Sequence, residues 1–178
     1  MSQHDRPKFA GISLSAAGIG AVIRQRPEKY NMLMSFAEEI LREPSHLSAA
    51  QREVLAAYTS SLNGCEYCRG SHAAFAESLG ASDSDLEAAS GGEIRGHPME
   101  ALLEYVKKLT VAPSGITEAD KQAVHAAGFS EEQLKDAIAV CAAFNLFNRL
   151  VEGHGIGPRD DYSADTTMIN AHGYDRRR

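Results

Sequence analysis

Residues 51–80 read QREVLAAYTSSLNGCEYCRGSHAAFAESLG, and this stretch gathers the reactive side chains of the chain. Cys65, Cys68 and His72 fall at positions i, i+3 and i+7, which lie on one face of an α-helix. Glu53 precedes the first cysteine by twelve residues, within an alanine-bearing helical run. The spacing therefore predicts two thiols and an imidazole on one helix wall, with a carboxylate on the preceding helix.

Capping patterns predict where these two helices begin. Ser48 and Gln51 form such a pattern, and it starts a helix with Glu53 in its first turn. Asn63, followed three residues later by Glu66, predicts the start of the next helix. A tight turn after Asn63 would join the two helices and would let the carboxylate fold back toward the thiols.

The chemistry that this cluster favours is proton transfer to a thiol. A free cysteine has a pKa of about 8.5 and attacks peroxides or disulfides only as its thiolate. The partial positive charge of a helix N-terminus favours the thiolate by about 0.3 to 1 kcal/mol. His72 can exchange a proton one turn beyond Cys68, and Glu53 can polarise that imidazole. Two cysteines three residues apart can also form a disulfide if their rotamers permit, so that one sulfur resolves the other after oxidation.

The pattern Glu53, eleven residues, Cys65, two residues, Cys68, three residues, His72 resembles the signature of the alkylhydroperoxidase D group of the carboxymuconolactone decarboxylase superfamily. Two longer stretches also resemble the peroxidase-related branch of that superfamily: LSAAQREVLAAYTSSLNGCEYCRGSHAAFAESLG at 47–80 and DAIAVCAAFNLFNRLVEG at 136–153. The similarity covers about residues 27–157.

The resemblance implies a thiol-dependent peroxidase with an all-α fold. Cys68 would become the sulfenic acid on meeting a hydroperoxide, while Cys65 would donate a proton and close the disulfide. Glu53 and His72 would form the proton relay, and a dithiol reductant, either a protein or a lipoyl group, would restore the thiols without metal, haem or flavin. The best-known members carry a histidine immediately before the second cysteine, where this chain has Tyr67. A phenol has a pKa of about 10, so Tyr67 cannot replace that histidine near neutral pH.

Other functions also fit parts of the pattern. CxxCxxxH offers three zinc ligands, and Glu53 would be a fourth, although the chain has no second CxxC. A thiol redox-sensing module would use the same two sulfurs. A carboxymuconolactone-type decarboxylase is a further alternative, but that branch generally lacks the redox pair. A thioredoxin-like site is disfavoured because the preceding VLAAYTSSLN predicts a helix instead of a strand.

Composition narrows the range of partners and compartments. The 178 residues suit one domain, and a net charge of −6 with a pI near 5.6 gives no electrostatic case for nucleic acid or an anionic membrane. The sequence shows no apolar run of about 18 residues and no signal-like start, so no transmembrane helix or signal peptide is expected. One redox pair among three cysteines fits a reducing compartment, which makes the cytoplasm the expected location.

The rest of the sequence predicts an all-α, single-domain helical bundle with two arms. Further helices are expected to start at Pro27, Ser82, Met99, Thr117 and Ser130. The bundle would span 27–157, between an N-terminal arm at 1–26 and a C-terminal arm at 158–178. The C-terminal arm shows no sustained period and is expected to be extended and to pack on another chain. The resemblance likewise implies a homo-oligomer, whether a dimer, a trimer or a hexamer.

Four residues outside the reactive stretch also carry expectations. Asn145 and Asn148 lie on or beside the apolar stripe of the last long helix, where buried amides need hydrogen-bond partners. They should therefore tie this helix to a neighbour or to a partner subunit. Cys141 lies in an apolar run and is expected to be a buried, inert thiol. His97 is expected in a solvent-exposed turn.

Overall fold

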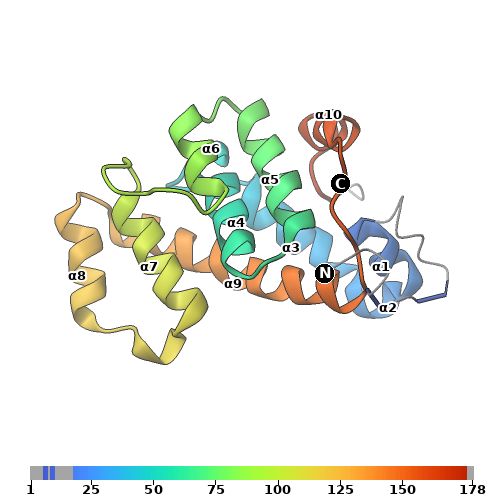
Figure 1. Ribbon diagram of the computed structural model, residues 1–178, viewed down its shortest axis with the longest axis horizontal. Coiled ribbons are helices and arrows are strands. Elements are labelled where there is room, and N and C mark those ends of the chain that lie inside the picture. Colours follow the sequence, from blue (N-terminus) through green and yellow to red (C-terminus); the bar gives the residue numbers. More distant parts are fainter. Residues whose placement is uncertain (1–5, 8, 11–17, 176–178) are drawn as a thin grey trace.

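The described part of the chain is built from helices. This computed structural model describes residues 6–7, 9–10 and 18–175, and no β-strand occurs among them, which confirms the predicted all-α fold (Figure 1). None of the helices in these ranges is long and apolar enough to cross a membrane. The elements are α1 (Ile19–Gln25), α2 (Pro27–Tyr30), α3 (Met32–Leu41), α4 (Ala49–Leu62), α5 (Glu66–Ser78), α6 (Asp83–Ala89), α7 (Glu100–Val111), the 3-10 helix η2 (Pro113–Gly115), α8 (Glu118–Ala126), α9 (Glu131–Gly153) and α10 (Ser163–His172).

The central helix of the bundle is α4. It packs mainly against α5 and α9 and also contacts α6 and α7 (Figure 1). All of its residues from 52 to 60 are buried. The hydroxyls of Thr59 and Ser60 donate hydrogen bonds to the carbonyl oxygens of Leu55 and Ala56, each at 2.8 Å. These bonds within the helix allow the two polar side chains to be buried between α4 and its neighbours.

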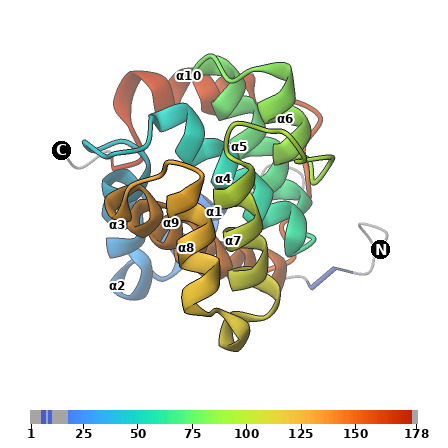
Figure 2. The same cartoon turned by 90° about the vertical axis from the view of Figure 1, so that its left-hand side faces the viewer.

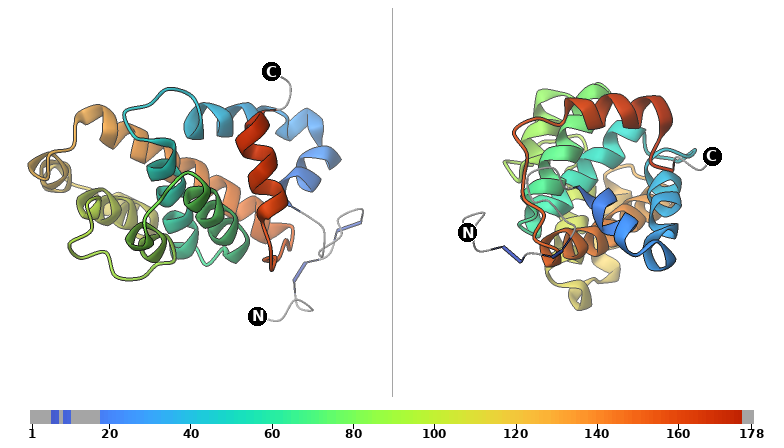
Figure 3. Two further views of the ribbon diagram at one scale, coloured as in Figure 1. Left: turned by 90° about the horizontal axis from the view of Figure 1, so that it is seen from above. Right: turned by 90° about the vertical axis from the view of Figure 1, so that its right-hand side faces the viewer.

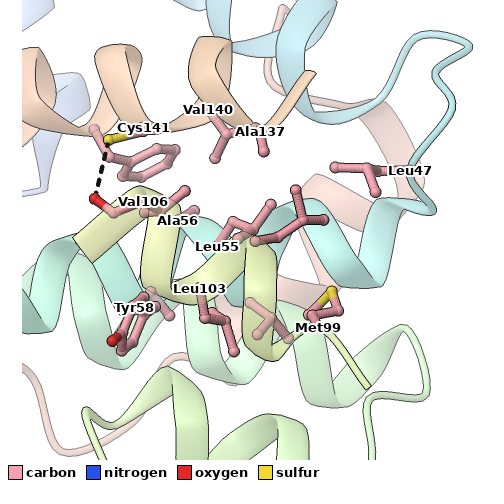
Figure 4. Close-up of a cluster of buried hydrophobic side chains, with 14 of the residues drawn as sticks. Leu47, Leu55, Ala56, Tyr58, Met99, Leu103, Val106, Ala137, Val140 and Cys141 are labelled. Carbon is pink, nitrogen blue, oxygen red and sulfur yellow. Dashed lines mark hydrogen bonds between the residues drawn. The ribbon is translucent and has the colours of Figure 1, made fainter. Parts of the chain in front are cut away.

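The main apolar core lies between α4, α7 and α9. Figure 4 shows Leu55 of α4, Leu103 and Val106 of α7, and Val140 of α9 in one cluster. Cys141 is fully buried there, with its sulfur 3.9 Å from the Val106 carbonyl oxygen. The expected burial of this thiol is therefore confirmed, and it belongs to a different apolar cluster from the other two cysteines.

Most of the predicted helix starts are observed. Three helices begin with capping boxes, in which a serine side chain accepts from the N3 amide while the N3 side chain accepts from the serine amide: Ser48 with Gln51, Ser82 with Asp85, and Ser130 with Gln133. The helix expected from Pro27 is divided at Asn31 into α2 and α3. At the end of the molecule opposite α1 and α2, α7 and α8 lie side by side and face the viewer in Figure 2.

The segment after α9 is not the extended arm that its sequence pattern suggested. It contains α10, which lies along α5 across the bundle (Figure 3). Only one residue of α10, Ile169, is buried, so the helix has no regular apolar stripe that periodicity would reveal. Beyond α10, the Tyr174 amide donates a hydrogen bond to Glu38 of α3. The end of the described chain is thereby held against the bundle.

Side-chain amides join α4 to α9, as expected for Asn145 and Asn148, and Asn148 is buried. The Asn148 side-chain nitrogen donates to the Ser60 hydroxyl at 2.9 Å. The Asn63 side chain in turn donates to Oδ1 of Asn148 at 2.9 Å and to Oδ1 of Asn145 at 3.3 Å. The network links the C-terminal end of α4 to α9 beside the turn that precedes Cys65.

His97 differs from its expected position in a solvent-exposed turn. It is only 8% exposed, and its Nδ1 accepts a hydrogen bond from the Met99 amide at 3.0 Å. Its Nε2 lies 3.1 Å from a carboxylate oxygen of Asp85 in α6. The histidine therefore fixes the loop before α7 to α6, a long-range contact that local sequence could not show.

Candidate functional site

The turn between α4 and α5 positions both cysteines. Asn63 caps the end of α4, and its amide donates to the Thr59 carbonyl at 3.1 Å. Gly64 follows with a φ of +68°, a left-handed conformation that glycine adopts without strain. The Cys65 amide then donates to the Ser60 carbonyl at 2.9 Å, and Cys65 is the N-cap of α5. The predicted helix start at Asn63 was wrong by two residues, because asparagine is common in turns as well as at the first position of a helix.

Cys65 and Cys68 are free thiols that are almost completely buried. They are 0% and 3% exposed, and Cys68 lies in the first turn of α5. A side-chain hydrogen bond with Cys68, followed by burial, raises the pKa of the Cys65 thiol. A hydrogen bond that raises a thiol pKa is one in which the thiol keeps its proton and donates it. The hydrogen bond and the burial both disfavour the thiolate form of Cys65.

Glu53 is completely buried and has three hydrogen-bond partners. Its Oε2 lies 2.6 Å from Nδ1 of His72, and its Oε1 accepts a hydrogen bond from the Tyr174 hydroxyl at 2.8 Å and another from Arg42. Burial alone would favour the neutral acid, but the charges of His72 and Arg42 and the hydrogen bonds outweigh it. The pKa of Glu53 consequently lies below its usual value, so the side chain is a buried carboxylate near neutral pH.

The His72 ring is held in one orientation by its neighbours. It packs edge to face against Phe144 with centroids 4.4 Å apart and against Phe75 at 5.2 Å, and it stacks with Tyr174 at 6.3 Å. A charged carboxylate at Nδ1 favours the tautomer that carries its proton on that nitrogen. Nε2 is then the ring nitrogen that can accept a proton, which suits a general base.

A cavity of about 530 Å³ opens against one thiol and the imidazole. Cys68 and His72 line this cavity, whereas Cys65 does not. The remaining wall is mostly apolar and comes from α1, α3, α5, α9, α10 and the segment after α10. Its apolar and aromatic residues include Ile19, Ile23, Met34, Leu41, Phe75, Phe144, Phe147, Val151, Met168, Ile169 and Tyr174. A solute in the cavity would therefore meet Cys68 first.

Tyr67 occupies the position of the family histidine and also lines the cavity. Burial is the main cause that raises the pKa of its phenol above the usual value. Its ring packs edge to face on Tyr162 at 5.9 Å, and the Arg159 guanidinium lies 5.5 Å from the ring centroid. The phenol is thus a protonated wall residue, in agreement with the inference that it cannot shuttle protons near neutral pH.

The zinc alternative fits this geometry poorly. Within the described ranges, no group of three or more histidine, cysteine, aspartate or glutamate side chains is arranged to hold a metal ion. Both oxygens of Glu53, the fourth ligand of that alternative, already bond to His72, Arg42 and Tyr174. Binding of a metal by Glu53 would therefore have to break this buried hydrogen-bond network.

The sequence analysis did not predict that Arg42 and Tyr174 belong to the site. Arg42 follows the last residue of α3, and a basic side chain at this position usually interacts with the dipole of the helix C-terminus. Its sequence position therefore did not indicate a role in the site. Tyr174 lies beyond α10, 121 residues after Glu53. Their convergence depends on tertiary packing, since α3 contacts α4 and α10 contacts α5.

The fold and the cluster together define a class of protein: an all-α thiol protein whose CxxC pair lies beside a hydrogen-bonded glutamate and histidine. Residues 27–95 match the model of the carboxymuconolactone decarboxylase family. This match and the similarity to solved structures confirm the resemblance to the superfamily that includes the alkylhydroperoxidase D group. No curated protein sequence gives a significant match to the chain.

Solved structures share this fold. An uncharacterized peroxidase-related protein from Silicibacter sp. TM1040 is 26% identical, covers 81% of this chain and 77% of its own, and has a TM-score of 0.73. A second uncharacterized peroxidase-related protein, described as an alkylhydroperoxidase AhpD core from Ralstonia eutropha JMP134, is 20% identical with a TM-score of 0.76 and covers 87% and 93% of the two chains. A protein of unknown function from Agrobacterium tumefaciens is 20% identical with a TM-score of 0.65, covering 79% and 97%.

Proposed function

We propose that the protein is a thiol-dependent peroxidase that reduces hydroperoxides through Cys68 and Cys65. One observation carries this proposal: Cys68 lines an apolar cavity beside His72, whose Nδ1 lies 2.6 Å from the buried carboxylate of Glu53. The family and the peroxidase-related neighbours support an antioxidant role in general terms. The specific chemistry follows from what the four side chains can do.

In the first step Cys68 attacks the hydroperoxide. His72 takes the thiol proton at Nε2, and Glu53 stabilises the resulting imidazolium. The thiolate then attacks the terminal oxygen, so an S–O bond forms while the O–O bond breaks. The leaving alkoxide takes the proton from His72 and departs as an alcohol. Cys68 is thereby oxidised to the sulfenic acid, the peroxide is reduced, and the relay returns to its starting protonation state.

In the second step Cys65 closes the disulfide. Its sulfur attacks the sulfenic sulfur of Cys68, an S–S bond forms, and the S–O bond breaks with loss of water. The two cysteines lie in one apolar cluster at the start of α5, which supports this pairing. A dithiol reductant, a protein or a lipoyl group, then restores both thiols by exchange. The cycle needs no metal, haem or flavin.

Serine substitutions at the two cysteines test these roles. Cys68→Ser should abolish hydroperoxide consumption, because the attacking sulfur is lost. Cys65→Ser should leave a sulfenic acid at Cys68 that a dimedone-type probe labels, as detected by peptide mass spectrometry. Cys141→Ala provides the control: this thiol lies in another cluster, so the variant should retain wild-type consumption. An unlabelled, unreactive Cys68 in the Cys65→Ser protein would show that the roles are misassigned.

Thiol titration, turnover with a dithiol and zinc content of the wild-type protein separate the proposal from its alternatives. One equivalent of hydroperoxide should consume two thiols, and added dithiol should support repeated turnover. A single oxidation that no dithiol extends into turnover would indicate a redox-sensing module. Stoichiometric bound zinc, with both thiols protected from alkylation, would indicate a metal site.

A further inference from the structure

Tyr174 joins the C-terminal segment to the thiol site. It lies beyond α10, and its hydroxyl donates a hydrogen bond to Oε1 of Glu53 at 2.8 Å. Its ring stacks on the His72 imidazole, with centroids 6.3 Å apart and 16° between the planes. Burial and then the charge of Glu53 raise the pKa of the Tyr174 phenol well above its usual value, so the hydroxyl keeps its proton. One side chain therefore contacts both members of the Glu53–His72 pair.

The two oxygens of the Glu53 carboxylate have different partners. Oε1 accepts hydrogen bonds from Arg42 and from the Tyr174 hydroxyl. The Arg42 guanidinium also lies 4.9 Å from the Tyr174 ring centroid, within the range of a cation–π interaction. Oε2 lies 2.6 Å from Nδ1 of His72. The two donors on Oε1 fix the rotation of the carboxylate, and this rotation determines how Oε2 meets the imidazole.

A clamp formed by Glu38 and Ser35 of α3 sets the position of Tyr174. The amides of Tyr174 and Asp175 both donate to Oε2 of Glu38, the latter at 3.3 Å, and the Ser35 hydroxyl donates to the Asp175 carboxylate. Gly173 has a φ of +70°, and a Cβ there would come within 2.5 to 2.8 Å of the Glu38 carboxylate. Glu38 binds backbone amides, so it can hold the segment whichever side chain residue 174 carries.

We propose that Tyr174 is a positioning residue of the proton relay: its hydroxyl orients the Glu53 carboxylate toward Nδ1 of His72, and its ring holds the imidazole. The inference rests on the proposed peroxidase function and extends the site to the C-terminal segment, which the clamp on α3 holds in place. Tyr174 exchanges no proton in this role. It acts through Glu53 and His72, and keeps Nε2 of the imidazole as the proton acceptor.

Tyr174→Phe tests this role because it removes the hydroxyl and keeps the ring. In the wild type, the Nδ1 proton of His72 should resonate far downfield of the backbone amides, because it lies in a short hydrogen bond to a carboxylate. Labelling with ¹⁵N-histidine, and absence of the signal from His72→Ala, identify it. In Tyr174→Phe the signal should broaden or disappear, because a carboxylate that can rotate leaves the proton open to exchange with water.

The rate of Cys68 oxidation gives the functional readout. It is measured in a Cys65→Ser background, where the sulfenic acid persists, by quenching with dimedone at intervals after addition of hydrogen peroxide. Tyr174→Phe should slow this oxidation about five- to tenfold, which is part of the 10²-fold or more that a positioned base contributes. An unchanged rate would overturn the positioning role.

Tyr58→Phe is the matched control. Tyr58 is a buried tyrosine on α4, the helix that carries Glu53, but it packs in the main apolar core and does not line the cavity (Figure 4). Its variant should keep the downfield signal and should oxidise Cys68 within about twofold of the wild-type rate. Equal losses in Tyr58→Phe and Tyr174→Phe would reduce the effect to a general loosening of the bundle and would overturn the assignment.

Glu38→Ala tests the clamp at a distance from the relay. In the described part of the chain Glu38 bonds to the amides of Tyr174 and Asp175, and not to Glu53 or His72. Its loss should weaken the same signal and slow the same oxidation, because Tyr174 is no longer held against α3. Wild-type behaviour of this variant would overturn the part assigned to the clamp.

The downfield signal requires no peroxide chemistry, so it separates the two proposals. A wild-type protein whose Cys68 does not react with hydroperoxide would refute the peroxidase, while the signal would still report on Tyr174. A signal that is unchanged in Tyr174→Phe would overturn the positioning role, whether or not the protein reduces hydroperoxides.

Discussion

At the scale of single residues, the site depends on keeping a carboxylate charged without water. Glu53 is 0% exposed, and removing an ion from water is unfavourable by several kcal/mol unless it is paired and hydrogen-bonded. The positive charge of Arg42 and the hydroxyl of Tyr174 meet that requirement even when His72 is neutral. The histidine is thus free to change its protonation state during a reaction while its partner stays ionised.

The pH dependence of stability should reveal this carboxylate. The pKa of Glu53 is lowered in the folded protein, so the unfolded chain binds the extra proton below the usual value of 4.5. The stabilisation is therefore fully present above pH 4.5 and is lost as the pH falls through the folded pKa. Glu53→Gln should remove this acid-dependent loss. At pH 7 it should also lower the free energy of unfolding by about 3–5 kcal/mol, because the Arg42 charge loses its partner.

Urea unfolding at pH 7 and at several values below 4.5 checks this prediction. The control is Glu104→Gln, whose side chain is 53% exposed and makes only a 3.5 Å ion pair with Lys107. That variant should change stability by no more than about 0.5 kcal/mol at pH 7. Parallel pH profiles for wild type and Glu53→Gln would contradict a buried ionised carboxylate.

At the scale of elements, local signals predicted helix starts better than helix ends and turns. Ser48, Ser82 and Ser130 cap helices through bonds that reach only three residues along the chain, so the sequence contains all the information needed. Asn63 was misread because its side chain bonds to Asn145 and Asn148, more than 80 residues away. The Glu53 to His72 contact was foreseeable because two adjacent helices and one short turn determine it.

Gly64 should prove essential to the turn that joins these helices. A Cβ at this position meets no atom within 4 Å, so the only penalty for alanine is its left-handed backbone with φ of +68°. Gly64→Ala should therefore lower the free energy of unfolding by about 1–2 kcal/mol. Gly153, in the last turn of α9, also has open space but lacks a positive φ, and Gly153→Ala should raise stability by about 0.5–1 kcal/mol. Thermal unfolding of the two variants measures the contrast, and equal shifts would argue against backbone strain.

At the scale of the whole molecule, the site is assembled from distant parts of the chain. Residues 27–95, the range that the family model matches, contain both thiols, Glu53 and His72. Much of the remaining cavity wall comes from α1, α9 and α10, outside that range. Such contacts between distant segments have no signature in local periodicity, which is why the C-terminal segment was expected to be extended. The division into an arm at 1–26, a domain at 27–157 and an arm at 158–178 stays a prediction, as do the homo-oligomer and its cytoplasmic location.

The C-terminal segment should control access to Cys68. Met168, Ile169 and Tyr174 line the cavity, and Tyr174 also stacks on His72 and bonds to Glu53. A chain that ends at Pro158 would lack this wall, so a bulky maleimide should label Cys68 several-fold faster than in the 178-residue chain. Peptide mass spectrometry measures the labelling, and Cys141, which packs in the other cluster, should stay protected in both proteins if the bundle remains folded. Unchanged labelling of Cys68 would place the entrance to the cavity elsewhere, because the removed segment would then have covered no path to the sulfur.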